Sequence, residues 1–319
     1  MDWFEELFGF AEESPDFVRA NLVAEGEWLQ SRVTGRRLHA GRLHHQRLAE
    51  MRERPVRPGR LRLREVVGDV GALHTDPANA GAVFQVASQF NLLEMISPDV
   101  TPEQGITRYA SDHTQGPACA MACAAGTVFR NHLVMVNGQR GQSTARQLDG
   151  LDALGTALGN EKGRLWQMRN GYALATLTGL DEIAGRIEAG EADRLRDLIR
   201  VGVQGDTDVT LPGADHRVSQ IYCSAMPVAY SAHGADAWEP FARLALEAAY
   251  EATMLAALKA PGPLYLTLLG GGVFGNRMDW ILDAIARALQ LFAETDLDVR
   301  IVSYRRTRPE LAGLLARFG

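Results

Sequence analysis

The chain has 319 residues with a formal net charge of −6, and 46% of its residues are hydrophobic. This length allows one large domain or two ordinary ones, and the apolar fraction is sufficient for a packed core. The mild acidity argues against a general nucleic-acid-binding protein, which would present a basic face.

Three further features narrow the class of protein. The N-terminal segment MDWFEELFGF lacks the basic residues of a signal peptide. The longest apolar run is far shorter than the roughly 18 residues that cross a bilayer. The cysteines Cys119, Cys123 and Cys223 do not form a disulfide framework or a metal-ligand pattern, and we expect them to be buried thiols. We therefore expect a cytoplasmic protein with no membrane contact, no metal and no cofactor.

Residues 1–60 are predicted to form an N-terminal helical extension. Phe17, Leu22 and Trp28 recur at helix-like spacing, and a second, polar helix is expected over Arg42–Arg52. The segment Arg54–Gly59, with the sequence RPVRPG, is typical of a linker. A separate domain is expected to follow it.

Residues 61–319 are predicted to form one α/β domain of three layers, with a mixed, largely parallel sheet. Strands and helices alternate in the last third of the chain, which is typical of parallel βαβ units. Residues 127–200 are predicted to be a mostly helical insertion, whose segment Trp166–Tyr172 either closes over a ligand or caps the domain. The expected strands are Leu61–Val67, Ala82–Asn91, Val218–Met226, Leu264–Leu269 and Val299–Tyr304, and the expected helices include Trp238–Lys259, Met278–Leu291 and Pro309–Phe318.

The most informative motif is LYLTLLGGGVFGN, in which a buried strand ends in three glycines before a helix. Glycine permits positive φ and a close approach of the backbone to a ligand, and N–H groups at a strand-to-helix turn bind anions. The loop is neither a Walker A motif nor a GxGxxG dinucleotide fingerprint. It is predicted to hold an anionic ligand at the carboxyl end of its strand, with a tight structural turn as the alternative.

GGGVFGN resembles the diphosphate loop of the macrodomain superfamily, in which a strand leads through Gly-[Ile/Val]-[Phe/Tyr]-Gly into a helix. Other segments follow in macrodomain order, and the resemblance covers residues 61–126 and 201–319. It implies that the chain binds ADP-ribose. The residues that it assigns to ligand binding are Asp69, Val70, Gln89, Asn91, Thr114, Gln115, Gly116, Gly270, Gly271, Gly272, Val273, Phe274, Gly275, Asn276 and Tyr304.

The first loop differs from that of ordinary macrodomains. The usual NAAN and glycine run is replaced by SQFNLLEM and a long segment that contains acidic residues. This loop is similar to that of the glycohydrolase-like branch, which includes poly(ADP-ribose) glycohydrolases and MavL-type ADP-ribosyl hydrolases. The signature of the poly(ADP-ribose) glycohydrolases themselves, a GGG followed by Gln-Glu-Glu, is absent from the chain.

The resemblance implies cleavage at the distal ribose through an oxocarbenium-like transition state, which a carboxylate can stabilise. The candidates are Glu94, Glu103 and Asp112 in the first loop. Their alternatives are a surface salt bridge for Glu94, an ordinary loop position for Glu103 and an N-cap for Asp112. We favour Glu94 and Asp112 as the catalytic pair, with Asn91 either positioning the ribose or bonding to the neighbouring loop.

These motifs predict an ADP-ribosyl hydrolase whose substrate is an ADP-ribosylated protein or another acceptor. The alternatives are a non-catalytic reader of ADP-ribosylated partners and a structural protein that has lost the site. The acidic loop favours the hydrolase, because a reader has no need of carboxylates beside an anionic ligand. A nucleic-acid acceptor is compatible with this prediction but is not indicated by the composition.

Overall fold

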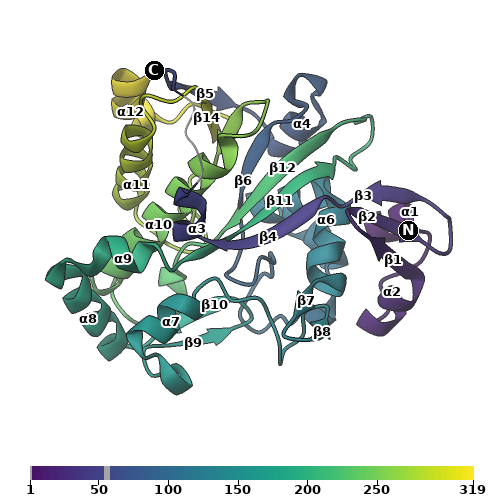
Figure 1. Ribbon diagram of the computed structural model, residues 1–319, viewed down its shortest axis with the longest axis horizontal. Helices are drawn as coiled ribbons and strands as arrows, with labels where there is room; N and C mark the ends of the chain where they lie inside the picture. The colour runs from purple at the N-terminus through teal and green to yellow at the C-terminus, as the bar shows by residue number, and fades with distance from the viewer. Residues whose placement is uncertain (1, 54–57) are drawn as a thin grey trace.

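The computed structural model describes residues 2–53 and 58–319, so the predicted linker at Arg54–Gly59 lies mostly outside the described residues. Its centre is a seven-stranded sheet with the strand order β4-β11-β12-β6-β13-β14-β5 (Figure 1). The strands are β4 (Arg42–Arg47), β5 (Arg62–Val67), β6 (Val83–Ala87), β11 (Arg200–Asp208), β12 (Arg217–Cys223), β13 (Leu264–Leu266) and β14 (Asp298–Ser303).

Five strands of this sheet, β12, β6, β13, β14 and β5, run parallel to one another. Of the remaining two, β11 pairs antiparallel with β12, and β4 pairs antiparallel with β11 at the edge of the sheet. The predicted mixed, largely parallel sheet is therefore confirmed. Because the carboxyl ends of parallel strands lie at one edge of a sheet, the loops that follow these five strands are neighbours.

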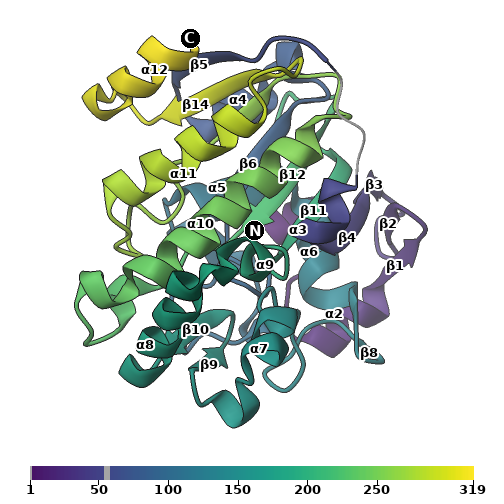
Figure 2. The ribbon, with the colours of Figure 1, turned by 60° about the vertical axis from the view of Figure 1, so that its left-hand side comes forward.

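Alternating side chains of the central strands serve two separate cores, as the period of a strand requires. Phe84 and Val86 of β6 pack with helices α4 (Val70–Thr75) and α5 (Gln115–Ala122) on one face. Val83 of β6 packs on the other face, together with Leu264 and Leu266 of β13 and two long helices. These helices, α10 (Ala235–Ala257) and α11 (Met278–Leu291), cross that face in Figure 2, so the three layers are helices, sheet and helices.

The N-terminal extension is only partly helical. Its helices are α1 (Trp3–Phe8), α2 (Pro15–Asn21) and α3 (Leu48–Arg52), and between them lie β1 (Leu22–Glu25), β2 (Trp28–Ser31), β3 (Arg37–His39) and β4. The helix predicted through Trp28 is therefore wrong, and the one predicted over Arg42–Arg52 is confirmed at Leu48–Arg52 but wrong over Arg42–Arg47. The latter segment is an edge strand because β11 supplies its backbone hydrogen bonds along one side, a partner that local spacing does not reveal.

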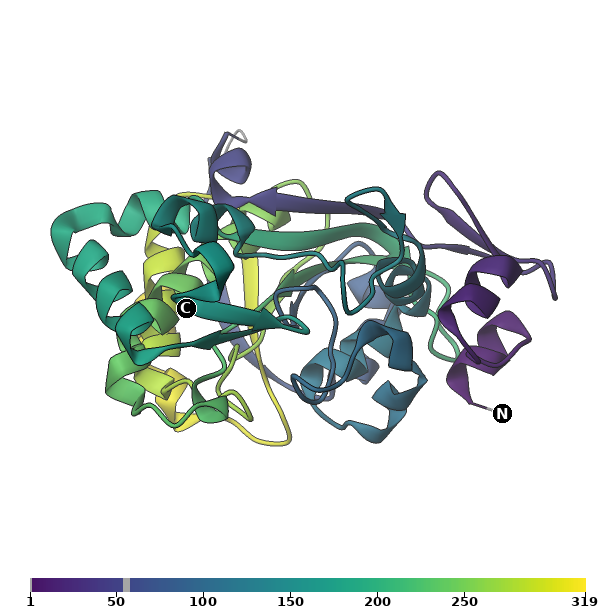
Figure 3. The same ribbon diagram turned by 90° about the horizontal axis from the view of Figure 1, so that it is seen from below.

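The insertion contains two hairpins as well as helices. Each hairpin turns through an Asn-Gly pair with both residues at positive φ, at Asn137-Gly138 and Asn170-Gly171, which matches the twist of paired strands. Figure 3 places α8 and α9 at one end of the molecule and α1, α2 and β1–β3 at the other. The elements are β7 (Met135–Val136), β8 (Gln139–Arg140), α7 (Asp152–Leu158), β9 (Trp166–Arg169), β10 (Tyr172–Ala175), α8 (Leu177–Arg186) and α9 (Ala192–Arg196).

In the described part of the chain, no helix combines the length and apolar character that crossing a bilayer requires. The three cysteines are buried free thiols, as predicted.

Candidate active site

A cavity of about 340 Å³ opens at the carboxyl ends of β6, β12 and β13. Its walls come from segments that are far apart in the sequence, and the loops after these three strands supply most of them. A single residue of the insertion, Tyr172, completes the lining. The contributing stretches are 87–89, 94–96, 112, 114–117, 172, 225, 230, 267–270 and 272–274.

The predicted glycine loop forms one wall of this cavity. Gly270 and Gly275 have φ of +74° and +73°, which only glycine adopts readily. Asn276 closes the loop, since its N–H donates to the Gly270 carbonyl at 3.0 Å and its side-chain amide donates to the Met226 carbonyl at 2.8 Å. Among the described residues, nothing accepts a hydrogen bond from the N–H groups of Gly272, Val273 or Phe274. These free donors make the loop suited to an anion.

The N-terminus of α5 forms a second wall. Gln115 fixes the helix to the end of β6, because its side chain accepts from the Ala87 N–H at 2.9 Å and donates to the Gln85 carbonyl at 2.8 Å. Gly116 allows this close approach, since a Cβ there would lie 2.1 Å from the Ala87 carbonyl oxygen and 3.1 Å from Cγ of Glu94. Any larger residue at this position would push α5 away from the strand and the carboxyl group.

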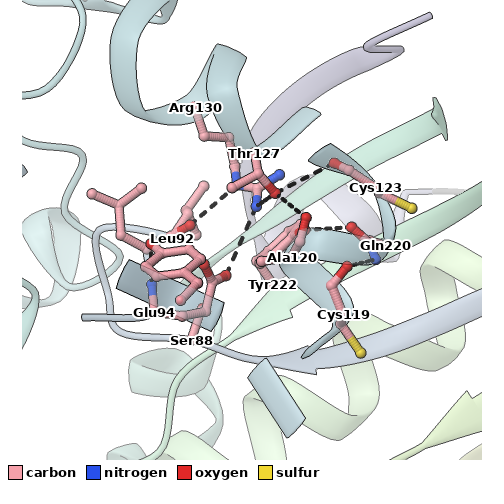
Figure 4. A network of polar contacts seen from close by, with 12 residues as sticks. Ser88, Leu92, Glu94, Cys119, Ala120, Cys123, Thr127, Arg130, Gln220 and Tyr222 are labelled. Carbon is pink, nitrogen blue, oxygen red and sulfur yellow. Dashed lines mark hydrogen bonds and ion pairs between the residues drawn. The ribbon is translucent and has the colours of Figure 1, made fainter. Parts of the chain in front are cut away.

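Glu94 lines the cavity and carries a buried carboxyl group. Its side chain is 1% exposed, and neither carboxyl oxygen has a hydrogen-bond partner within the described part of the chain. The Glu94 backbone N–H donates to the Tyr109 hydroxyl at 2.9 Å, which fixes the residue in place. Burial raises the pKa of Glu94 to about 8, opposed by the positive charge of Arg130 (Figure 4). The carboxyl group therefore retains its proton at neutral pH.

Asp112 lines the same cavity as Glu94, as the sequence predicted. One of its carboxylate oxygens accepts from the Thr114 N–H at 2.9 Å, which forms the turn that leads into α5. Asp112 thus has a structural role, and its second oxygen makes no hydrogen bond with any other described residue. The two favoured carboxylates face one space from opposite ends of the first loop.

Three aromatic rings pack together beside the carboxyl group. Tyr172 of the insertion lies 5.1 Å from Tyr230, which follows β12, and 5.3 Å from Phe274 of the glycine loop, measured between ring centroids. The Tyr172 hydroxyl also donates to the Met95 carbonyl at 2.6 Å. The insertion therefore joins the glycine loop to the segment that carries Glu94.

Two of the predicted residues lie away from the cavity. Glu103 accepts from the Thr144 N–H at 2.7 Å and from its hydroxyl at 2.9 Å, in a separate, exposed region. Asn91 is fully buried. Its side-chain nitrogen donates to the Gln147 side chain, and its side-chain oxygen accepts from the Leu93 N–H. The second interpretation of Asn91, a bond to the neighbouring loop, describes its position, because Gln147 belongs to the insertion. The structure does not bring Glu103 or Asn91 to the cavity.

Three others lie at the neighbouring strands of the same sheet edge. Asp69 caps α4 by accepting from the Ala72 N–H directly after β5, and Val70 is buried beneath it. Tyr304 follows β14 and is 55% exposed. Because β14 lies next to β13 and β5 lies next to β14, these residues lie along the same sheet edge but outside the cavity.

Several residues of the site were missed from the sequence. Met95, Ile96, Tyr230 and Thr267 line the cavity, but no local pattern distinguishes them from ordinary loop residues. Arg130 did leave a signal, because a lone arginine in the apolar segment ACAAGTVFRNHLV requires a buried partner.

Comparisons with known proteins found similar chains among solved structures. No family model matches the chain, and no curated protein matches it. The solved structures that match include bacterial poly(ADP-ribose) glycohydrolases. A point variant of the Deinococcus radiodurans enzyme in complex with ADP-ribose is 12% identical with a TM-score of 0.45, covering 85% of this chain and 95% of that chain. The Thermomonospora curvata enzyme bound to the inhibitor ADP-HPD is 14% identical with a TM-score of 0.42, covering 95% of both chains.

Proposed function

We propose that this protein is an ADP-ribosyl hydrolase that releases ADP-ribose from a modified protein or another acceptor. The observation that carries the proposal is the position of Glu94, whose buried carboxyl group makes no hydrogen bond within the described residues. It lines a cavity whose other wall is a loop of free N–H groups. A binding module for an anionic ligand has no use for such a carboxyl group, whereas an acid catalyst requires one.

The proposal gives the ligand a direction along the sheet edge. The diphosphate binds the free N–H groups of the loop after β13, at the centre of the crevice. The distal ribose then lies toward β6 and Glu94, and the adenosine lies toward Tyr304 after β14 and Asp69 after β5. From β6 to β5 there are three strand intervals, or about 14 Å at the usual spacing between strands.

The proposed reaction uses the proton that Glu94 holds at neutral pH. Glu94 donates this proton to the leaving atom of the acceptor as the bond to C1″ breaks, and the bonding electron pair leaves with the acceptor. Asp112 stabilises the oxocarbenium-like sugar or activates the water that attacks C1″. The proton of that water restores the Glu94 acid, so the products are free ADP-ribose and the unmodified acceptor.

A panel of substrates that carry ADP-ribose on arginine, serine, glutamate or nucleic acid tests this proposal, with free ADP-ribose as the readout. We expect the wild-type protein to release ADP-ribose from at least one of them. Glu94→Gln should lower kcat by about 100-fold or more, the usual effect of losing a general acid. Its affinity for ADP-ribose in calorimetry should change little, because the diphosphate is held elsewhere.

Glu103→Gln is the matched control, since it makes the same chemical change at a carboxylate outside the cavity and should leave kcat unchanged. If the wild-type protein binds ADP-ribose but releases none from any substrate, the reader function replaces the hydrolase. Equal loss of activity in both variants would remove Glu94 from the reaction.

A further inference from the structure

Arg130 lies behind Glu94 and is entirely buried, with 0% of its side chain exposed. Its Nε donates to the Leu92 carbonyl at 3.1 Å, its Nη2 donates to the Thr127 hydroxyl at 3.1 Å, and its guanidinium lies 3.5 Å from the ring centroid of Tyr222 (Figure 4). Three contacts from separate elements thus hold this cation in one place.

The backbone at this point is adapted to bury polar side chains. Phe129–Leu133 forms a π-helical turn, closed by a hydrogen bond from the Val134 N–H to the Phe129 carbonyl at 2.8 Å. Such turns redirect side chains and occur frequently at functional sites. Here Arg130 turns toward Glu94, and His132 bonds to Glu12. The charge of Arg130 is therefore a built feature of the fold.

Within the described residues, Glu94 is the only carboxylate in ion-pair range of Arg130, with 3.8 Å between Nη2 and Oε1. At this distance the two groups attract one another without sharing a hydrogen bond. A hydrogen-bonded pair would hold the carboxylate charged and leave it no proton to donate. A buried carboxyl group without any cation would be unable to release its proton.

We infer that Arg130 is a positioning residue for Glu94. The buried guanidinium of Arg130 stabilises the carboxylate that remains after Glu94 has given its proton to the leaving group. The catalytic meaning of this inference rests on the proposed hydrolase function. The charge coupling between the two side chains does not, and it can be measured in a protein that hydrolyses nothing.

The other titratable groups around Glu94 do not supply this charge. Burial raises the pKa of Tyr109, Tyr222, Cys119 and Cys123, so all four stay neutral where Glu94 titrates. Asp112 lines the same cavity but is an acid. Arg130 is therefore the cation that makes a charged Glu94 tolerable.

The test is a titration of Glu94 by ¹³C NMR of protein labelled at the glutamate carboxyl carbons, with Glu94→Gln to assign the signal. Arg130→Gln should raise the titration midpoint by about one pH unit or more, the usual effect of an opposite charge at this range. Arg130→Lys retains the charge and should shift the midpoint less. Arg146→Gln, an exposed arginine that bonds to the Asn137 carbonyl, should leave it unchanged.

A second measurement decides the matter if Arg130→Gln does not fold. The Nε–H resonance of Arg130 in the wild-type protein should shift with pH at the midpoint of Glu94, and this shift should vanish in Glu94→Gln. An unchanged Glu94 midpoint in folded Arg130→Gln, or an Arg130 resonance that is indifferent to Glu94, would overturn the inference. In an active protein, the alkaline limb of the pH profile of kcat should move to higher pH in Arg130→Gln. A purely structural role would instead lower kcat by the same factor at every pH. Absence of activity in the wild-type protein would contradict the proposed function and leave the titration result standing.

Discussion

Glu94 couples the stability of the protein to pH. Its pKa is near 4.5 in an unfolded chain and is raised to about 8 in the fold, so the folded protein binds more protons between these values. The contribution of this group to stability is therefore complete below pH 4.5 and is lost as the pH rises toward 8, by at most about 1.4 kcal/mol per pH unit.

We expect Glu94→Gln to remove this dependence. The free energy of unfolding of the variant, measured by denaturant titration, should increase relative to that of wild type from pH 5 to pH 8.5, because only wild type loses the stabilising protonation of Glu94. The uncompensated charge of Arg130 adds a constant that cancels in this comparison, because Arg130 is charged throughout. A difference between the two proteins that stays the same at both pH values would mean that Glu94 ionises normally in the fold.

Gly272 offers a precise test of the anion loop. A Cβ at this position meets no atom within 4 Å, whereas one at Gly271 would lie 3.0 Å from Ile281 and one at Gly270 2.4 Å from Ala225. Gly272→Glu should therefore fold normally and place a negative charge beside the free N–H groups. Repulsion between like charges should weaken ADP-ribose binding by about 100-fold or more in calorimetry.

Gly272→Gln controls for the size of the side chain and should bind far better than Gly272→Glu. Equal affinities in the two variants would mean that no diphosphate occupies this loop.

At the scale of secondary-structure elements, the hairpin of β9 and β10 acts on the site through Tyr172. Its hydroxyl holds the Met95 carbonyl, next to Glu94, and a buried hydrogen bond of this kind contributes about 1 kcal/mol. Tyr172→Phe retains the ring and its packing but frees the segment that carries the carboxyl group. We expect kcat to fall by about 10-fold, with little change in the affinity for ADP-ribose.

Tyr265→Phe is the corresponding control, because the Tyr265 hydroxyl donates a buried hydrogen bond to Asn79 outside the cavity. Both variants should lose similar stability in thermal unfolding, but only Tyr172→Phe should lose turnover. A parallel loss of kcat in both would indicate a general loosening of the fold rather than a local effect.

The predictability of these elements from sequence depended on whether their signal was local. The periodic apolar residues of α11 predicted its bounds correctly at Met278–Leu291, and the glycine loop is contiguous and follows a buried strand. In contrast, β11 contains Gly202, Gly205 and two aspartates, which disfavour a strand by propensity. It exists because β4 and β12 pair with it on both sides. Tyr172, Arg130 and Glu94 likewise come together only through tertiary contacts between separate segments, which the sequence does not reveal.

At the scale of the whole molecule, the N-terminal extension supports the site from a distance. The Glu12 carboxylate accepts from the Ile106 and Thr107 N–H groups at 2.8 Å and lies 2.6 Å from His132. The segment it holds continues to Tyr109, whose hydroxyl accepts the Glu94 N–H. A chain of buried polar contacts thus leads from the extension to the carboxyl group.

Glu12→Ala should lower the free energy of unfolding by about 3 kcal/mol, because it leaves several buried polar groups without a partner. It should also reduce kcat in folded protein while ADP-ribose binding persists. Glu13→Ala changes an exposed neighbour and should do neither, as denaturant titration and ADP-ribose release would show. Full turnover in folded Glu12→Ala would mean that the extension has no influence on the site.

The strand order also has a consequence for how the chain reaches this structure. β4 and β5, the first two strands of the central sheet along the chain, occupy its opposite edges. β4 pairs with β11, more than 150 residues later, and β5 pairs with β14, more than 230 residues later. During synthesis both strands leave the ribosome long before their partners exist, and their unpaired backbones are open to association with other chains. Contacts so distant in sequence also slow folding, so the sheet is completed only when the last strand has been made.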